Sequence, residues 1–224
     1  MRKNLFLLLG FLLNLNLSAQ SAPAPEKSDP EAKKVLDRIR KKYDKYNTVE
    51  IAFTLTSELP EQPKDVQKGT IGQQGNKFRF EMPGQQIIVS DGKTTWTYLK
   101  KNNEIQINDA DPKNESIPLT PKDLLRQYEK GDYLYAITDK ITEKGKVLTQ
   151  IEFKPKNKSS EFHKLRVSVD EKAGAIDNIK AFAKDGSRYT FQITRTTPNK
   201  VFDANSFQLD PKQFPGVHVE DLRM

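Results

Sequence analysis

The sequence predicts a mainly β protein of the α+β class, with about eleven antiparallel strands in one sheet and two helices. After residue 47, apolar and polar residues alternate along most of the chain, as in strands that bury one face. Turn residues separate the alternating segments at regular intervals. Apolar residues have helical spacing in only two stretches, and no interior linker or repeat divides residues 30–224. One folded domain over residues 30–224 is therefore expected.

The first 20 residues have the three parts of a secretory signal peptide. Arg2 and Lys3 supply the positive start, residues 5–17 form a leucine-rich core, and small residues suited to cleavage follow. A transmembrane anchor is the alternative, but the apolar run is short and interrupted by polar residues. We expect residues 1–20 to be removed and residues 21–29 to form a flexible leader. Because the chain has no cysteine, a bacterial periplasm is favoured over the eukaryotic exterior.

The first helix is predicted to begin at Pro30, with Asp29 as its N-cap and Glu31 in its first turn. Its predicted apolar side consists of Val35, Leu36, Ile39, Tyr43 and Tyr46. Lysines and arginines occupy the opposite side, so we expect this helix to lie on the surface with one face buried.

Strand segments follow this helix almost to the end of the chain. Their cores are predicted at residues 51–55, 78–82, 87–89, 96–98, 104–108, 133–138, 147–153, 163–169, 176–182 and 188–195. Asp91-Gly92 is typical of a two-residue hairpin turn, and Gly145, Gly174 and Asp185-Gly186 fall where other turns are expected. Residues 72–75, Gly-Gln-Gln-Gly, are also interpreted as a turn.

A second, shorter helix interrupts the strands at residues 121–130. Thr120 can cap it, Pro121 suits its first turn, and Gly131 can end it. Its predicted apolar side consists of Leu124, Leu125 and Tyr128.

The composition excludes several kinds of chemistry. Without cysteine there is no disulfide, no thiolate metal site, no cysteine nucleophile and no lipid anchor on an N-terminal cysteine. His163 and His218 are the only histidines, and neither belongs to a metal or nucleophile motif. We therefore expect no metal, no cofactor and no catalytic residue. Lysine and arginine exceed aspartate and glutamate by 37 to 30, but the charges are mixed along the chain, which favours a solvated surface over a nucleic-acid site.

Large apolar side chains are predicted to gather on one face of the sheet. They are Phe53, Phe78, Phe80, Met82, Trp96, Tyr98, Phe153, Phe182 and Phe191. A packed core is the simple interpretation of any one of them. However, only 35% of residues are apolar, and two helices cannot fill a wide trough as densely as a second sheet would. A trough lined by aromatic residues is also suited to an apolar ligand such as an acyl chain.

Two segments in this region resemble the LolA family of periplasmic outer-membrane lipoprotein carriers. The more specific segment is Ser90–Tyr98, SDGKTTWTY. The other segment is Lys77–Met82, KFRFEM, which precedes it and also resembles the family. Residues 69–71, 120–125, 201–207 and 215–223 resemble other parts of the family in the same order, so the likeness spans residues 31–223. The family commonly has Arg-Pro before the strand at residues 77–82, an arginine that ties lid to barrel, whereas this chain has Gln74-Gly75.

The resemblance implies an unclosed antiparallel β-barrel of about eleven strands, with a helical lid over an apolar cavity for acyl chains. The residues that would line the cavity are Phe53, Phe78, Phe80, Met82, Ile87, Val89, Trp96, Tyr98, Phe153, Phe182 and Phe191. The inner face of the lid would consist of Val35, Leu36, Ile39, Tyr43, Leu124 and Leu125.

The resemblance also implies a function in which no covalent bond is made or broken. A monomeric carrier would receive triacylated lipoproteins from an inner-membrane ABC transporter of the Lol type and pass them to an outer-membrane acceptor. The alternative is a periplasmic sensor or adaptor of the same fold that binds lipid or protein in envelope stress signalling. A lipid hydrolase is disfavoured because the chain has no nucleophile motif.

Overall fold

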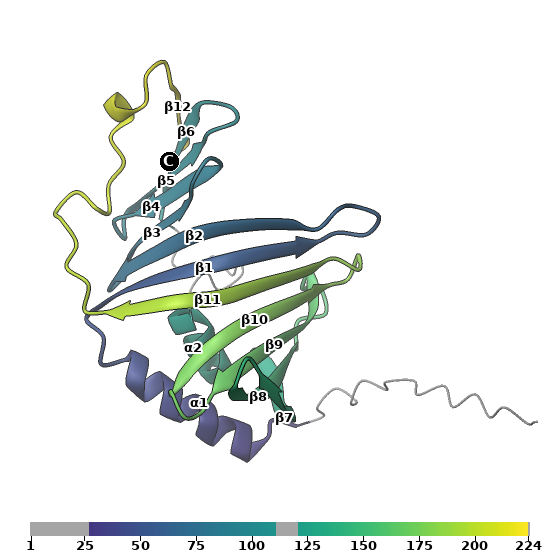
Figure 1. Cartoon of the computed structure of the whole chain (residues 1–224). Helices are drawn as coiled ribbons and strands as arrows, with labels where there is room; N and C mark the ends of the chain where they lie inside the picture. The colour runs from purple at the N-terminus through teal and green to yellow at the C-terminus, as the bar shows by residue number, and fades with distance from the viewer. Residues whose placement is uncertain (1–26, 111–120, 224) are drawn as a thin grey trace, which may run out of the picture.

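The computed structural model describes residues 27–110 and 121–223, and its main feature is one large curved sheet with two helices on its inner side (Figure 1). The helices are α1 (Pro30–Tyr43) and α2 (Pro121–Lys130), and a short 3₁₀ helix spans Pro211–Gln213. The strands of the first half are β1 (Thr48–Glu58), β2 (Asp65–Gln74), β3 (Lys77–Met82), β4 (Gln86–Ser90), β5 (Thr94–Leu99) and β6 (Glu104–Asp109). The strands of the second half are β7 (Tyr133–Glu143), β8 (Lys146–Pro155), β9 (Phe162–Asp170), β10 (Ala175–Ala183), β11 (Arg188–Pro198) and β12 (His218–Asp221).

The sheet has 12 strands in the order β12-β6-β5-β4-β3-β2-β1-β11-β10-β9-β8-β7. Its two edges, β12 and β7, do not pair, so the barrel is unclosed as expected. All pairs are antiparallel except β12 with β6, which is parallel. The extra strand beyond the predicted eleven is this short C-terminal one, in which His218 lies opposite Glu104.

The interpretation of residues 72–75 as a turn was wrong. Residues 72–74 are the end of β2 and pair with β3, and the turn consists of Gly75 and Asn76. Gly75 has a φ of 58°, which glycine adopts without strain. By contrast, the predicted turn positions at Gly92, Gly145, Gly174 and Asp185-Gly186 are confirmed, since each of these glycines lies between two paired strands. The turn at Gly92 is longer than the predicted two residues, because Asp91, Gly92 and Lys93 separate β4 from β5.

The start of α1 is attached both to the helix itself and to the edge of the sheet. Asp29 is the predicted N-cap, and its Oδ1 accepts a hydrogen bond of 2.8 Å from the backbone N–H of Glu31. Its Oδ2 accepts one of 3.2 Å from the N–H of Ile137, and its own N–H donates to the carbonyl of Tyr135 at 2.8 Å. One residue therefore caps α1 and ties it to β7.

The second helix covers the inner side of the sheet next to α1 (Figure 1). Leu124, Leu125 and Tyr128 are buried, as the spacing predicted. Its predicted cap, Thr120, lies outside the described residues, as do the predicted signal peptide and residues 21–26 of the leader.

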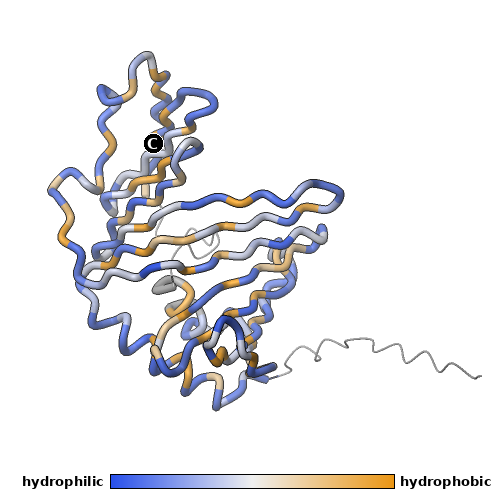
Figure 2. Tube along the Cα trace, viewed as in Figure 1, coloured by the Kyte–Doolittle hydropathy of each residue, from blue (hydrophilic) through white to orange (hydrophobic). Residues whose placement is uncertain are grey.

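Among the residues that the structure describes, neither helix has the length and apolar character needed to cross a membrane. Hydropathy instead alternates along the strands, where apolar positions are flanked by polar ones (Figure 2).

Replacing Asp29 with alanine is expected to lower the free energy of unfolding by about 1–2 kcal/mol, because a helix N-cap and a link to β7 are lost together. Urea unfolding of the purified variant measures this. Asp132→Ala, which removes an exposed carboxylate near the other helix, should change stability much less. Equal effects would contradict the capping role.

Candidate functional site

The inner face of the sheet is apolar from β7 across to β4. Residues directly opposite one another on paired strands point to the same face, so the register identifies its members. Ile51 lies opposite Ile71, Ile71 opposite Phe80, and Phe80 opposite Ile88. In the other direction the same face continues through Phe53, Phe191, Ile179, Val167, Ile151 and Ile137.

The two helices pack on the β7–β10 part of this face. Val35, Leu36, Ile39, Tyr43, Leu124 and Leu125, predicted as the inner face of a lid, are all buried in one cluster with residues of β7 to β10. Phe153, a predicted cavity residue, belongs to this cluster and is 1% exposed. The burial of these side chains agrees with the prediction, and their role as a lid remains a prediction.

The β1–β3 part of the inner face carries a separate aromatic cluster of Phe53, Ile71, Phe80 and Met82. Within the described residues, no side chain of α1 or α2 belongs to it. The Phe53 ring stacks on Phe80 and Phe191, with ring centroids 5.5 Å and 4.3 Å apart. Leu55, Ile88 and Phe191 border the cluster and are only partly buried. The helices thus cover one half of the apolar face, and stacked rings occupy the other.

Gly69 on β2 lies directly beneath the Phe53 ring. A Cβ at this position would contact that ring and would lie 2.6 Å from the carbonyl oxygen of Glu81. Only glycine therefore allows Phe53 to lie flat against the sheet.

Four of the predicted cavity residues lie on the opposite face, so their assignment to the inner face was wrong. Trp96 and Tyr98 lie opposite Val89 and Ile87, and these four point outward because Ile88 points inward. They pack beneath the C-terminal segment in a cluster with Ile105, Ile107, Phe202, Phe207, Leu209, Phe214 and Val217. The alternation of apolar and polar residues was predicted correctly. The face was wrong because the buried side of the sheet changes at β4.

Phe182 was also assigned to the wrong face. It lies opposite Lys164 on the outer side of β10, half-exposed. The Lys164 Nζ lies 4.7 Å from the centre of its ring, and Arg166 and Lys180 are each 5.6 Å from it. Phe78 does lie on the inner face, half-buried opposite Gln73 and Ser90.

A polar group interrupts the inner face at the end of β2. Gln73 is 7% exposed and points inward, opposite Val49 and Phe78. Its Oε1 has no hydrogen-bond partner among the described residues. Gln74, which takes the place of the family's arginine in the sequence, is exposed. Sequence reasoning missed Gln73 because the register at the β2–β3 turn was not known.

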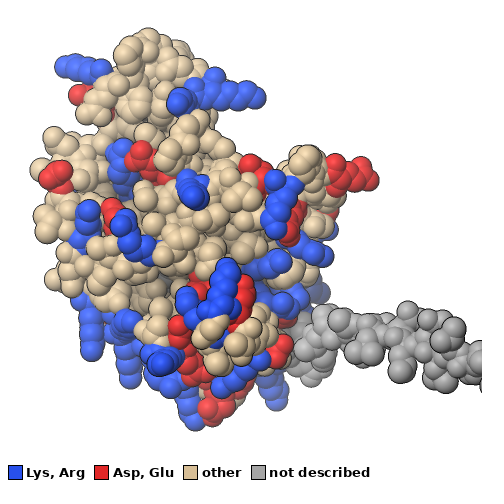
Figure 3. Space-filling view, viewed as in Figure 1, with Lys and Arg blue, Asp and Glu red and all other residues tan. Residues whose placement is uncertain are grey.

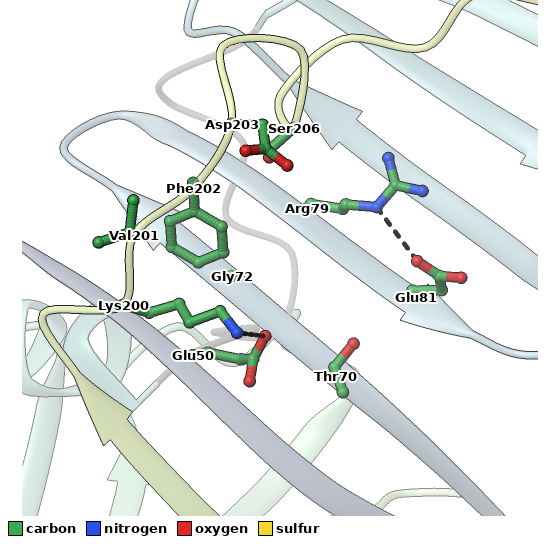
Figure 4. Close-up of a pocket in the computed structure, with 10 residues that line it drawn as sticks. All are labelled: Glu50, Thr70, Gly72, Arg79, Glu81, Lys200, Val201, Phe202, Asp203 and Ser206. Atoms are coloured by element: carbon green, nitrogen blue, oxygen red, sulfur yellow. Dashed lines mark hydrogen bonds and ion pairs between the residues drawn. The ribbon is translucent and has the colours of Figure 1, made fainter.

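The outer face also has a pocket, of about 310 Å³, between β1–β3 and residues 200–206 (Figure 4). Two ion pairs line it: Arg79 with Glu81 at 3.1 Å, and Lys200 with Glu50 at 3.8 Å. The Phe202 ring lies over Gly72, where a Cβ would be 2.8 Å from it. This polar pocket lies on the other side of the sheet from the apolar face, and sequence reasoning did not predict it.

Polar contacts hold the two helices together. The hydroxyl of Tyr128 donates to Asp37 Oδ1 at 2.6 Å, Lys33 Nζ lies 2.8 Å from Asp37 Oδ2, and Arg40 pairs with Glu129 at 3.1 Å. Although partial burial opposes ionisation, the hydrogen bonds from Lys33 and Tyr128 lower the pKa of the Asp37 carboxyl.

Further contacts attach α1 to the β9–β10 turn. Arg38 pairs with Glu171 at 2.5 Å, and Lys42 donates to the carbonyl of Ala173 at 2.6 Å. A hydrogen bond from Thr149, supported by Arg38, lowers the pKa of Glu171.

The architecture is an open sheet with an apolar inner face, and the two helices pack on the β7–β10 part of that face. The chain belongs to the LolA family: the model of the outer membrane lipoprotein carrier protein LolA matches residues 44–210. The resemblance noted in the sequence is thereby confirmed.

Curated relatives agree with this assignment, and one solved structure has a similar fold. The outer-membrane lipoprotein carrier protein of Edwardsiella ictaluri is 28% identical over 191 residues, covering 80% of this chain and 84% of that protein. The one of Serratia proteamaculans is 28% identical over 150 residues, covering 66% and 68%. An uncharacterized conserved protein from Thermus thermophilus has a similar fold, with a TM-score of 0.55 at 11% identity, over 87% of this chain and 99% of that one.

Gly69→Ala is expected to lower the free energy of unfolding by about 1–3 kcal/mol and to displace the Phe53 ring, because the backbone of Glu81 cannot yield to a methyl group. Chemical denaturation and aromatic NMR shifts would measure the two effects. Lys68→Ala, at an exposed position on the same strand, is the control. If Gly69→Ala left the free energy of unfolding unchanged, this would contradict the described packing.

Acid is expected to weaken the attachment of α1. Because the pKa values of Asp37 and Glu171 are lowered by folding, both carboxylates stabilise the protein above their ordinary pKa values of 3.8 and 4.5. This stabilisation is lost as the pH falls through the lower, folded-state values. Asp37→Asn/Glu171→Gln should therefore have a lower Tm than the unmodified protein at pH near 7, and the difference should shrink in acid. A difference in Tm that does not change with pH would contradict this prediction.

Proposed function

We propose that this protein is a periplasmic carrier that shields the acyl chains of lipoproteins and moves lipoproteins from the inner to the outer membrane. The observation that supports this most directly is the apolar inner face: the two helices pack on its β7–β10 part, and among the described residues neither helix contributes to the cluster of stacked rings on its β1–β3 part. No bond is made or broken in such a function. Membership of the LolA family supports the same conclusion.

The energetics suit an acyl chain. Each buried methylene contributes about 0.8 kcal/mol, so even part of one chain supplies useful affinity. The chains would lie against Phe53, Phe78, Phe80, Met82, Phe153 and Phe191, together with Leu55 and Ile88, which sequence reasoning had not singled out as cavity residues. The helices α1 and α2 would move away from the sheet to admit the cargo. Gln73 would place one hydrogen-bond acceptor beside the hydrocarbon.

The proposed partners follow from the path of the lipoprotein from the inner to the outer membrane. Residues 1–20 would direct export, a Lol-type ABC transporter in the inner membrane would deliver triacylated cargo, and an outer-membrane acceptor would receive it. The carrier would work as a monomer. Affinity must stay moderate, because a carrier that binds too tightly cannot release its cargo.

Native mass spectrometry of the mature protein purified with a co-expressed lipoprotein should detect the acylated complex. Absence of any acylated species, under conditions where a known carrier retains its cargo, would overturn the proposal. Crosslinking in cells separates the carrier from a sensor of the same fold. Transporter subunits are expected, and recovery of a membrane signalling protein instead would favour the sensor.

The inner face is expected to be more sensitive than the outer face to introduced charge. Phe191→Glu places a carboxylate on the half-buried border of the aromatic cluster and should weaken binding of acylated cargo by roughly tenfold or more. Thr190→Glu, the next residue on the same strand, points to the outer face beside Lys180 and should change it less than about twofold. Equal losses would show that the cargo does not use the inner face.

A further inference from the structure

The outward side of α1 and the turn after it carry a row of cations, here called the basic stripe: Lys34, Arg38 and Lys41 on the helix, and Lys45 in the turn that follows. The spacing of four and three residues places Lys34, Arg38 and Lys41 on one side of the helix, away from the buried side of Val35, Leu36 and Ile39. All four are exposed. Figure 3 shows lysine and arginine side chains projecting along the lower edge of the molecule, where α1 lies.

The acidic residues of the helix lie elsewhere or are already paired. Asp37 and Asp44 lie toward the α2 side, where they pair with Lys33 at 2.8 Å and Arg40 at 3.1 Å. Within the described part of the chain, Lys41 and Lys45 have no acidic partner. The basic stripe thus keeps an excess of positive charge.

Two acids do contact the basic stripe. Glu31 lies 2.7 Å from Lys34, which remains 70% exposed, and Glu171 pairs with Arg38. Glu171 is also approached by Lys140 at 3.5 Å, and Lys172 beside it is exposed. The neighbouring residues therefore contribute more positive charges than negative ones.

We propose that the basic stripe is a docking surface for the anionic phospholipid headgroups of a membrane. Three of its four members are lysines, which are flexible point charges without the fixed geometry that selects one carboxylate or phosphate. A row with about one cation per helical turn on the exposed side of a helix matches a diffuse negative surface better than a single acidic group does. The basic stripe extends back from residue 45, so it lies almost entirely before the region 44–210 in which the family model matches.

Docking would place the helix that covers the apolar face directly against the membrane. The buried and the charged sides of α1 would then have separate tasks: one packs on the sheet, and the other holds the protein near the bilayer. The inference does not depend on the identity of the cargo.

Flotation of the mature protein with vesicles tests this. The protein should bind vesicles of phosphatidylcholine mixed with phosphatidylglycerol, should not bind phosphatidylcholine alone, and should be released by high salt. Lys34→Gln/Lys41→Gln/Lys45→Gln should weaken binding by roughly tenfold or more. The matched control is Lys93→Gln/Lys100→Gln/Lys101→Gln, which removes the same charge at exposed turns of β4–β6 and should change binding less than about twofold.

Two results would overturn the proposal. Equal losses in both triple variants would show that net charge, not the basic stripe, controls binding. No binding of the unmodified protein to the anionic vesicles would exclude lipid and leave an acidic protein as the occupant. Either result leaves the carrier function standing, because acylated cargo is bound on the other side of the helix and is measured separately by native mass spectrometry.

Discussion

A sheet of 12 strands must bury its apolar side chains against helices of only 14 and 10 residues, and most features of this protein follow from that constraint. The helices reach the β7–β10 part of the inner face and leave β1–β3 without helical cover among the described residues. There the rings of Phe53, Phe80 and Phe191 cover one another. On the outer face of β4–β6, the C-terminal segment takes the place of a helix. The division of the inner face into two apolar clusters is thus a consequence of the proportions of the fold.

The strand β4 is where the buried side of the sheet changes. Ile87, Ile88 and Val89 are consecutive apolar residues, so the strand presents apolar side chains to both faces. Ile88 continues the inner face, whereas Ile87 and Val89 begin the outer cluster beneath residues 202–217. The same strand therefore connects the candidate binding face to a structural core that takes no part in it. This arrangement lets a chain with few apolar residues stabilise a wide sheet without a second sheet.

Local features of the fold were predictable from the sequence, and the pairing of distant segments was less so. Asp29, Pro30 and the glycine turns have local physical causes, so the helices and most strand cores were found correctly. The buried side chains of α1 and α2 also follow from periodicity, although Tyr46, predicted on the apolar side of the first helix, lies beyond its end and is half-buried. Trp96, Tyr98 and Phe182 were placed on the wrong face because alternation says which residues share a side, not which side is inside. Gln73 was missed because one residue of register decides whether it or Gln74 points inward.

The pairing of β1 with β11 has a consequence for the order in which the molecule can assemble. Partners such as Val49 and Pro198 are 149 residues apart in the chain, and this pair of strands joins the two halves of the sheet. Until residues 188–198 have emerged, the inner face of β1–β3 has no neighbour on that side and its aromatic cluster lacks Phe191. The amino-terminal half therefore remains incomplete through most of synthesis. Such late closure leaves the free edge of β1 open to pairing with other chains until β11 arrives.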